Sequence, residues 1–279
     1  MIKNKFSLLI LIFLAGLFIN SCEETITGVS LPYKEQIVVR GVIEPNGKFE
    51  GIHLTRTLNP LDEYDYNKAL VSDAEVNIIS DNQSYKLNFN GDVYNNNDIQ
   101  FLAGKQYQLD VKWKNHNPRA STFIPEQMEN VELQYDTTTI YYDFEIRFSE
   151  KVIEVFAYID AKPKNVYITG FLERGFEYFR DFSIYNYNQR DKDGKLKVVF
   201  AHFGFSDGMN NYDAIIRMIK NYEYFIDSYD EQYLNYYNTR YNGSMSGGIF
   251  GNEGLNIQWN VKGGLGLFIG RNRTIFKFN

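Results

Sequence analysis

The chain has 279 residues, of which 44% are hydrophobic, so it is long enough for about two packed domains and is not disordered as a whole. Its 29 basic and 35 acidic side chains give a formal net charge of -6, which argues against a general affinity for nucleic acid. Three histidines and one cysteine are too few for a typical zinc site, and we predict no metal and no cofactor.

The first 21 residues have the pattern of a secretory signal. Lys3 and Lys5 precede an apolar run over residues 6–19, and the small residue Ser21 follows it. The apolar run is about 14 residues long, whereas a membrane-spanning helix needs roughly 20. We therefore expect residues 1–21 to be removed as a signal peptide, which also removes two positive charges.

The lone cysteine follows this signal directly. Residues 19–22 read Ile-Asn-Ser-Cys and resemble the lipobox of bacterial lipoproteins, so we predict lipid attachment at Cys22. A plain secretory signal with an incidental cysteine is the alternative. Residues 22–34 then form a lipidated tether, and its acyl chains bind the protein to a membrane. Glu23 and Glu24 resemble an acidic export signal, which predicts an outer-membrane location with exposure at the cell surface.

Short strands separated by turns dominate residues 35–125. Segments 37–43 and 49–55 flank Pro45-Asn46-Gly47, and this pattern predicts a hairpin. Further strands are predicted over 74–79, 84–89 and 106–113, and residues 121–125 close the domain. Several short strands at this spacing predict an immunoglobulin- or transthyretin-like β-sandwich.

Residues 126–279 are predicted to form a second, antiparallel β domain, so the expected fold class is mostly β. Strands are expected over 131–135, 139–148, 152–159 and 166–172, followed by a hairpin that pairs 182–187 with 195–203 around Asp193-Gly194. After residue 241, a flexible loop is expected over residues 242–248. Two last strands, 255–261 and 265–269, are expected on either side of Gly263-Gly264.

A helical insertion is predicted at about residues 211–239. Apolar and aromatic residues recur there at intervals of three and four, at Ile215, Ile219, Tyr222, Ile226, Tyr229, Tyr233 and Tyr236. Ser228 has the spacing of a capping box and could begin a second helix. The simplest interpretation is a helix packed on the second sheet. Because a buried tyrosine hydroxyl needs a partner, a tyrosine stripe also fits a protein interface, and we name Tyr222, Tyr229, Tyr233, Tyr236 and Tyr237 as candidate partner contacts.

Five features of the chain are together similar to one known family. They are the lipobox, the opening strand Ile-Val-Val-Arg-Gly-Val-Ile, the segment from Val71 to Val76, the tyrosine-rich late helix and the terminal run Gly263-Gly264-Leu265-Gly266-Leu267-Phe268. The family is the Bacteroidota outer-membrane lipoprotein family called domain of unknown function 4249. Its members commonly accompany TonB-dependent transporters, so the resemblance implies that this chain works with an outer-membrane β-barrel complex. The resemblance supplies no catalytic residues.

Three classes of function follow from the sequence. We expect a non-enzymatic lipoprotein that acts as an accessory or docking subunit of a TonB-dependent transporter or another outer-membrane barrel. The alternative is a surface lipoprotein that binds glycan or peptide and feeds a transporter. A hydrolase is the third possibility, although His53, His116 and His202 lie far apart in the chain. The run Gly243-Ser244-Met245-Ser246-Gly247 does not place a serine at the centre of a Gly-x-Ser-x-Gly motif.

Overall fold

The structure is a computed structural model, and it describes residues 33–45, 47–143, 147–205, 212–245 and 257–278. Contact clustering separates a small unit, Met1–Lys34 with Asn59–Glu63, from a large one, Glu35–Leu58 with Tyr64–Asn279. All of the strands and helices given below belong to the large unit.

Strands predominate in the described chain, which confirms the mostly β class. The N-terminal part contains β1 (Ile37–Ile43), β2 (His53–Arg56), the short helix α2 (Tyr66–Ala69), β3 (Glu75–Ser80), β4 (Gln83–Phe89), β5 (Tyr94–Asn95), β6 (Gln106–Lys112) and β7 (Arg119–Phe123). The remainder contains β8 (Gln134–Asp143), β9 (Arg147–Ile159), β10 (Asn165–Glu173), β11 (Phe176–Asn186), the 3-10 turn η1 (Tyr187–Gln189), β12 (Leu196–Gly204), α3 (Tyr212–Asn221), β13 (Glu223–Asp230), α4 (Gln232–Met245) and β14 (Leu265–Phe276).

The strands form three sheets. A six-stranded sheet has the order β11-β10-β13-β14-β1-β2, a five-stranded sheet the order β5-β4-β3-β6-β7, and a three-stranded sheet the order β12-β9-β8. The predicted hairpin at the start of the fold is confirmed, because β1 pairs antiparallel with β2. All of the named strand pairs are antiparallel except one, since β1 pairs in parallel with β14.

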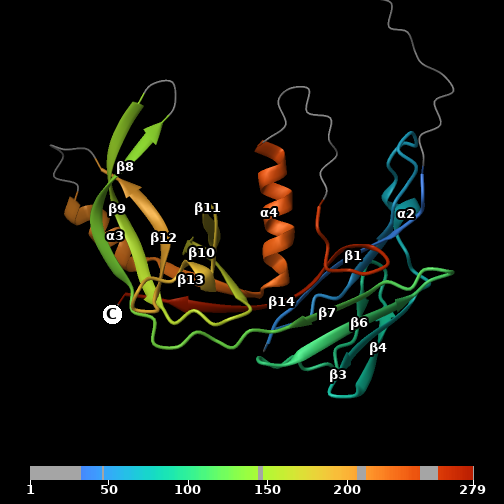
Figure 1. Cartoon of the computed structure of the whole chain (residues 1–279). Helices are drawn as coiled ribbons and strands as arrows, with labels where there is room; N and C mark the ends of the chain where they lie inside the picture. Colours follow the sequence, from blue (N-terminus) through green and yellow to red (C-terminus); the bar gives the residue numbers. More distant parts are fainter. Residues whose placement is uncertain (1–32, 46, 144–146, 206–211, 246–256, 279) are drawn as a thin grey trace, which may run out of the picture. The chain divides into compact units, whose positions relative to one another are not determined.

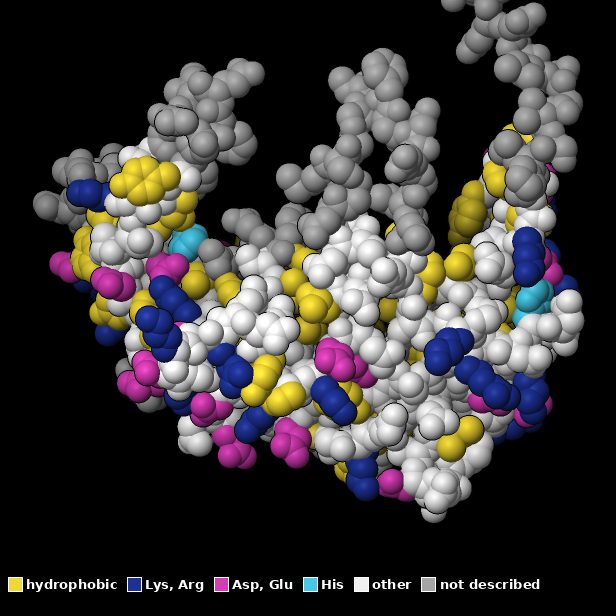
Figure 2. Space-filling model, viewed as in Figure 1, with side chains coloured by type: hydrophobic (Ala, Val, Ile, Leu, Met, Phe, Trp, Pro, Cys, Tyr) yellow, Lys and Arg dark blue, Asp and Glu magenta, His cyan; other side chains and the backbone are white. Residues whose placement is uncertain are grey.

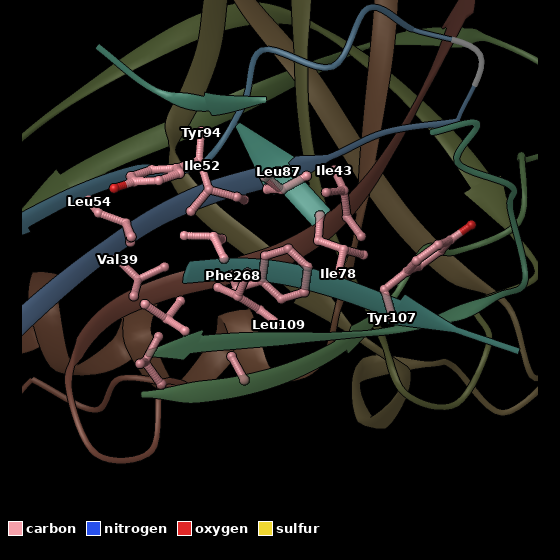
Figure 3. Close-up of a cluster of buried hydrophobic side chains, with 14 of the residues drawn as sticks. Val39, Ile43, Ile52, Leu54, Ile78, Leu87, Tyr94, Tyr107, Leu109 and Phe268 are labelled. Carbon is pink, nitrogen blue, oxygen red and sulfur yellow. The ribbon is translucent and has the colours of Figure 1, made fainter. Parts of the chain in front are cut away.

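A hydrophobic core lies between the five-stranded sheet and the β2-β1-β14 side of the six-stranded sheet. Strands β1 and β2 contribute Val39 and Leu54, and the opposite sheet contributes Ile78 and Leu109. Phe268 of β14 is fully buried in the same core (Figure 3). The sandwich-like arrangement of residues 35–125 therefore uses a strand from the far end of the chain.

Strand β14 is the element that joins the two β regions. Its first half pairs with β1, from Leu265 opposite Val38 to Gly270 opposite Ile43. Its second half pairs with β13, from Arg271 to Phe276, and Figure 1 shows it in red passing from β1 to β13. A single sheet thus runs through both predicted domains. The predicted boundary at residue 125 divides the chain by sequence position. In space, the pairing of β14 with β1 adds a C-terminal segment to the N-terminal strands.

A second core packs the three-stranded sheet against the β10-β13 part of the six-stranded sheet. Its fully buried members include Ala157 of β9, Phe200 of β12, Tyr167 of β10, Ile219 of α3 and Tyr224 of β13. Burial raises the pKa of the Tyr224 phenol far above its usual range. Its hydroxyl donates to the backbone oxygen of Ile219, at 2.9 Å, which fixes the end of α3 against this core.

Two sequence predictions about the second region are wrong. The single helical segment at about 211–239 is instead α3, the strand β13 and α4, so the seven stripe residues do not share one helix face. The predicted hairpin between 182–187 and 195–203 does not form, because β11 pairs with β10 whereas β12 pairs with β9. The Asp193-Gly194 turn lies between two sheets, where the Asp191 side chain accepts from the backbone N–H groups of Asp193 and Lys195.

Smaller differences concern the element ends. Parts of the strands predicted over 131–135 and 139–148 form a single strand, β8, which runs from Gln134 to Asp143, whereas residues 147 and 148 already belong to β9. Helix α4 continues to Met245, so residues 242–245 are helical and not part of a loop. The strand predicted over 255–261 is absent from residues 257–261, the portion of it that the structure describes, whereas the one predicted over 265–269 is confirmed and is longer.

Candidate docking surface

The predicted lipid-anchoring residues cannot be placed. Cys22, Glu23 and Glu24 lie outside the described residues, so lipidation and the export signal stay predictions. Among the helices that the structure describes, none combines the length and the apolar character that a membrane span requires.

The five candidate tyrosines fall into two separate groups. Tyr222, just after α3, stacks on Phe171 with a centroid distance of 5.1 Å and belongs to the second core. The other four lie at the end of β13 and in the first half of α4. Alternation along β13 puts Tyr224 and Ile226 on the side of the second core and Tyr229 on the opposite side of the sheet.

The second group fastens α4 to the six-stranded sheet. Tyr229 stacks on Tyr233 at 4.4 Å between ring centroids, and Tyr236 packs on Trp259 at 5.5 Å. Tyr229, Tyr236 and Tyr237 are buried, so they offer little surface to another molecule. Burial also raises the pKa of Tyr229 to about 12, so its phenol stays protonated. Within the described chain, these tyrosines act mainly as internal packing.

A chain of alternating charges crosses the same side of this sheet. Arg271 binds Glu44 at the end of β1, with 2.8 Å between Nε and Oε1. Arg273 binds the fully buried Asp227 through two parallel hydrogen bonds, Nε to Oδ1 at 2.6 Å and Nη2 to Oδ2 at 2.7 Å. Arg271 also lies 3.7 Å from Asp227, and Arg273 reaches Glu177 of β11.

The electrostatics of this charge chain, from Glu44 to Glu177, follow from its geometry. The guanidinium of Arg273 holds the pKa of Glu177 below its usual range. Bidentate geometry compensates Asp227 for the loss of its hydration, because both carboxylate oxygens accept charge-assisted hydrogen bonds. The five groups alternate in sign from Glu44 to Glu177, and this arrangement specifies how β14 lies between β13 and the end of β1.

The acidic group at the start of α4 has a different role. Asp230 is buried and accepts from the Thr122 hydroxyl at 2.9 Å and from the Phe123 backbone N–H at 3.0 Å. Its other oxygen accepts from the backbone N–H of Gln232 at 3.1 Å, the geometry of a helix N-cap. One carboxylate thus begins α4 and also holds β7 against the six-stranded sheet.

Two open clefts lie on either side of Gln232. The first, of about 550 Å³, is lined by polar and charged residues that include Gln108, Asp110, Arg119 and Lys262. The second, of about 490 Å³, is lined by residues that include Gln106, Lys164 and Glu231. Their size suits a small ligand, but their lining is less apolar than is usual for such sites.

Exposed aromatic side chains stand on two of the strands. Tyr141 of β8 is 80% exposed, and Phe176 and Phe179 of β11 are 70% and 51% exposed. Figure 2 shows hydrophobic side chains at the surface over the β8–β9 hairpin as well as elsewhere on the face in view. Large exposed apolar groups on regular strands favour a protein-binding surface.

The histidines occupy internal contacts and not a shared centre. His53 Nε2 lies 2.5 Å from the Tyr66 hydroxyl, and its Nδ1 lies 2.8 Å from Arg40 Nη2. His202 Nε2 lies 3.1 Å from Glu154. In the ranges that the structure covers, no three His, Cys, Asp or Glu side chains are grouped so that they could hold a metal ion.

The charge chain and the Asp230 contact were not predicted from the sequence. The sequence does contain one sign of the charge chain. In Arg271-Asn272-Arg273 the two arginines are two residues apart, which puts them on one face of a strand. Asp227 and Asp230 were hidden because their segment was interpreted as helical. Trp259, which covers Tyr236, lies in a segment that was predicted to be a strand.

The chain was compared with known families, curated proteins and solved structures. Residues 24–275 match the family model described as Domain of unknown function (DUF4249). No curated protein and no solved structure matches the chain.

Proposed function

Because the chain belongs to the DUF4249 family over nearly its whole length, we propose that it is a non-enzymatic lipoprotein that acts as a docking subunit of an outer-membrane complex. The partner is a TonB-dependent transporter or another outer-membrane β-barrel. Cys22 carries the lipid anchor, and Glu23 and Glu24 direct the protein to the cell surface.

The observation that carries the docking role is the exposure of large aromatic side chains on regular strands. Tyr141 is exposed on the three-stranded sheet, and Phe176 and Phe179 are exposed on opposite faces of β11 in the six-stranded sheet. Aromatic residues supply much contact area for a small loss of side-chain entropy, which is why they are enriched at interfaces. The internally packed tyrosines of α4 are not among these exposed side chains.

The test is purification of the tagged full-length protein from its native membranes in mild detergent. We expect an outer-membrane barrel to be recovered with it in a fixed ratio. Recovery of the lipoprotein alone would overturn the docking role.

Anchoring is tested separately with the variant Cys22→Ala. We expect the wild-type protein to sediment with outer membranes and to be cut by protease added to intact cells. The variant lacks the acylated thiol and is expected to leave the outer-membrane fraction. Equal membrane association of the two proteins would contradict the anchor, and protection from protease would contradict surface exposure.

A ligand-binding role is the second candidate, and the cleft beside Gln232 favours it. Arg119 and Lys262 lie together there, because their backbones exchange two hydrogen bonds of 2.9 and 2.7 Å. Amide side chains near two cations could bind a glycan or a peptide carboxylate. Calorimetric titration with oligosaccharides and short peptides tests this candidate, and the absence of heat with all of them would reject it.

A further inference from the structure

Strand β8 presents a long edge that no other described strand covers. Its ten residues, Gln134–Asp143, pair with β9 from Gln134 opposite Phe156 to Asp143 opposite Arg147, without a shift in register. In the three-stranded sheet β8 is the outermost strand, so one row of its N–H and C=O groups faces away from the sheet.

This edge lacks the features that normally prevent strand addition. Proteins protect such edges with lysine, proline, bulges or short strands, and β8 contains no lysine, proline or glycine. Other outer strands of the described sheets are shorter or irregular. Strands β2 and β5 have four and two residues, and the pairings of β11 and β12 contain register shifts.

One contact indicates which N–H groups of β8 face outward. The Asp136 carboxylate accepts a hydrogen bond of 2.7 Å from the backbone N–H of Thr137. An N–H that donates to a neighbouring side chain is the one that has no strand beside it. Because alternate N–H groups of a strand point the same way, those of Thr139 and Tyr141 share this outer edge.

The far half of the β8–β9 hairpin has still less support. Strand β12 pairs with β9 from Val152 to Ile159, and the backbone N–H of Phe205 then donates to the Lys151 carbonyl at 3.3 Å. Residues 147–150 of β9 pair with no described strand except β8. A two-stranded ribbon is marginally stable in water, and a third strand would stabilise it. Figure 1 shows this ribbon extending past the end of β12.

The charges along β8 select the kind of strand that it would accept. Residues 131–143 contain Glu132, Asp136 and Asp143 and no lysine or arginine. Asp136 lies opposite Glu154, and Glu154 is bound by Lys197 and His202 on its other side. Lys197 and His202 thus compensate Glu154, and a cation on the open edge would compensate Asp136.

We propose that β8 is the docking edge for an extended segment of the partner barrel that carries lysine or arginine, which adds to the three-stranded sheet as a fourth strand. Main-chain hydrogen bonds to β8 supply affinity, and pairing of the cation with Asp136 supplies register. This inference rests on the proposed docking function and names the surface through which it operates.

The test uses the full-length lipoprotein with its barrel, recovered from native membranes. A photoreactive phenylalanine analogue replaces Tyr141, which is 80% exposed, and in a control it replaces Tyr64, which is 72% exposed. We expect the first to crosslink to a lysine- or arginine-containing segment of the barrel and the second not to. Hydrogen exchange should show slower exchange at Thr137 and Thr139 in the complex than in the free protein.

Matched lysine variants separate this edge from the rest of the surface. The double variant Thr137→Lys with Thr139→Lys adds two charges to exposed positions of β8, and we expect it to lower barrel recovery by roughly tenfold because edge lysines oppose strand pairing. The control Ser84→Lys with Asn88→Lys adds the same charges to exposed positions of β4, inside the five-stranded sheet, and should recover the barrel normally. Circular dichroism checks that both variants fold.

The outcomes distinguish the two proposals. If the wild-type protein recovers no barrel, the proposed function fails. If it recovers the barrel and the β8 variant does so equally well, the docking function stands and this inference is overturned. Crosslinks from Tyr141 to a second copy of the chain, or unchanged exchange of the β8 amides in the complex, would also overturn it.

Discussion

Asp227 shows at the scale of a single residue how this sheet tolerates buried charge. Its carboxylate is fully buried on β13, yet both oxygens accept hydrogen bonds from Arg273. Desolvation of a charge is costly, so the group is tolerable only with such partners. Removal of the carboxylate leaves two arginines without their central anion.

We expect Asp227→Ala to lower the free energy of unfolding by about 3–5 kcal/mol, because it removes the buried anion between two arginines and leaves each with only its outer carboxylate. The control is Glu75→Ala, which breaks the exposed ion pair with Lys112 at 3.4 Å and should cost at most about 1 kcal/mol. Urea denaturation of both variants measures the difference. Similar losses in the two variants would show that the charge chain is not a special feature.

His53 makes stability depend on pH. Burial, together with the nearby Arg40, lowers the pKa of His53 below its ordinary value of 6.5. In the folded protein the imidazole therefore stays neutral at a pH where the unfolded chain already binds a proton. Its contribution is fully present above about pH 6.5 and is lost as the pH falls through the lowered pKa.

We expect the free energy of unfolding to decrease from pH 7 to pH 5, and His53→Gln to flatten that decrease. The measurement is urea denaturation of both proteins at several pH values across this range. Parallel curves for the wild type and the variant would mean that His53 does not supply the slope.

At the scale of elements, the interpretation of residues 211–239 shows where a periodic pattern fails. The segment Glu223–Asp230 contains apolar residues at both odd and even positions, so it fits a strand buried on both faces as well as a helix. Pairing with β10 on one side and β14 on the other decides for the strand. Those neighbours lie far away in the chain, so no local pattern could reveal them.

The glycine-rich run near the C-terminus is explained by the parallel β1–β14 pair. Gly266 has φ +106°, and a Cβ there would lie 1.9 Å from the backbone oxygen of Val39. Gly91 also has φ +106°, but no atom lies within 4 Å of its Cβ position. The two glycines therefore share one backbone conformation and differ in crowding.

We expect Gly91→Ala to lower stability by about 1–2 kcal/mol, because alanine is strained at positive φ. Gly266→Ala should cost about 1–3 kcal/mol more, because the methyl group also collides with the backbone of β1. Thermal unfolding of the two variants makes the comparison. Equal shifts would mean that only backbone conformation matters at Gly266.

At the scale of the whole molecule, β14 makes the two β regions depend on each other. The N-terminal core contains Phe268, and Asp230 and Asn272 of the second region bind the backbone of residues 123 and 125. The N-terminal region takes part of its core from β14, and the second region makes hydrogen bonds to the N-terminal region, so each region lacks contacts without the other.

A fragment of residues 35–125 is therefore expected not to fold alone, because its β1 lacks the β14 neighbour and its core lacks Phe268. The full mature chain should unfold in one cooperative transition. Proton NMR of the fragment and calorimetry of the full chain test this. A well-dispersed spectrum from the fragment would show that the sandwich is independent.

The sequence by itself determined the mostly β class, the opening hairpin, several inner strands and the family, because these depend on local alternation, turn residues and motifs. It also predicted the anchor at Cys22, which lies outside the described residues. Only the tertiary structure decided that residues 223–230 form a strand, that the tyrosines beside α4 pack inward, and that β14 joins both regions. Those features arise from contacts between residues far apart in the chain, and the pairing partners, not the local pattern, select the structure.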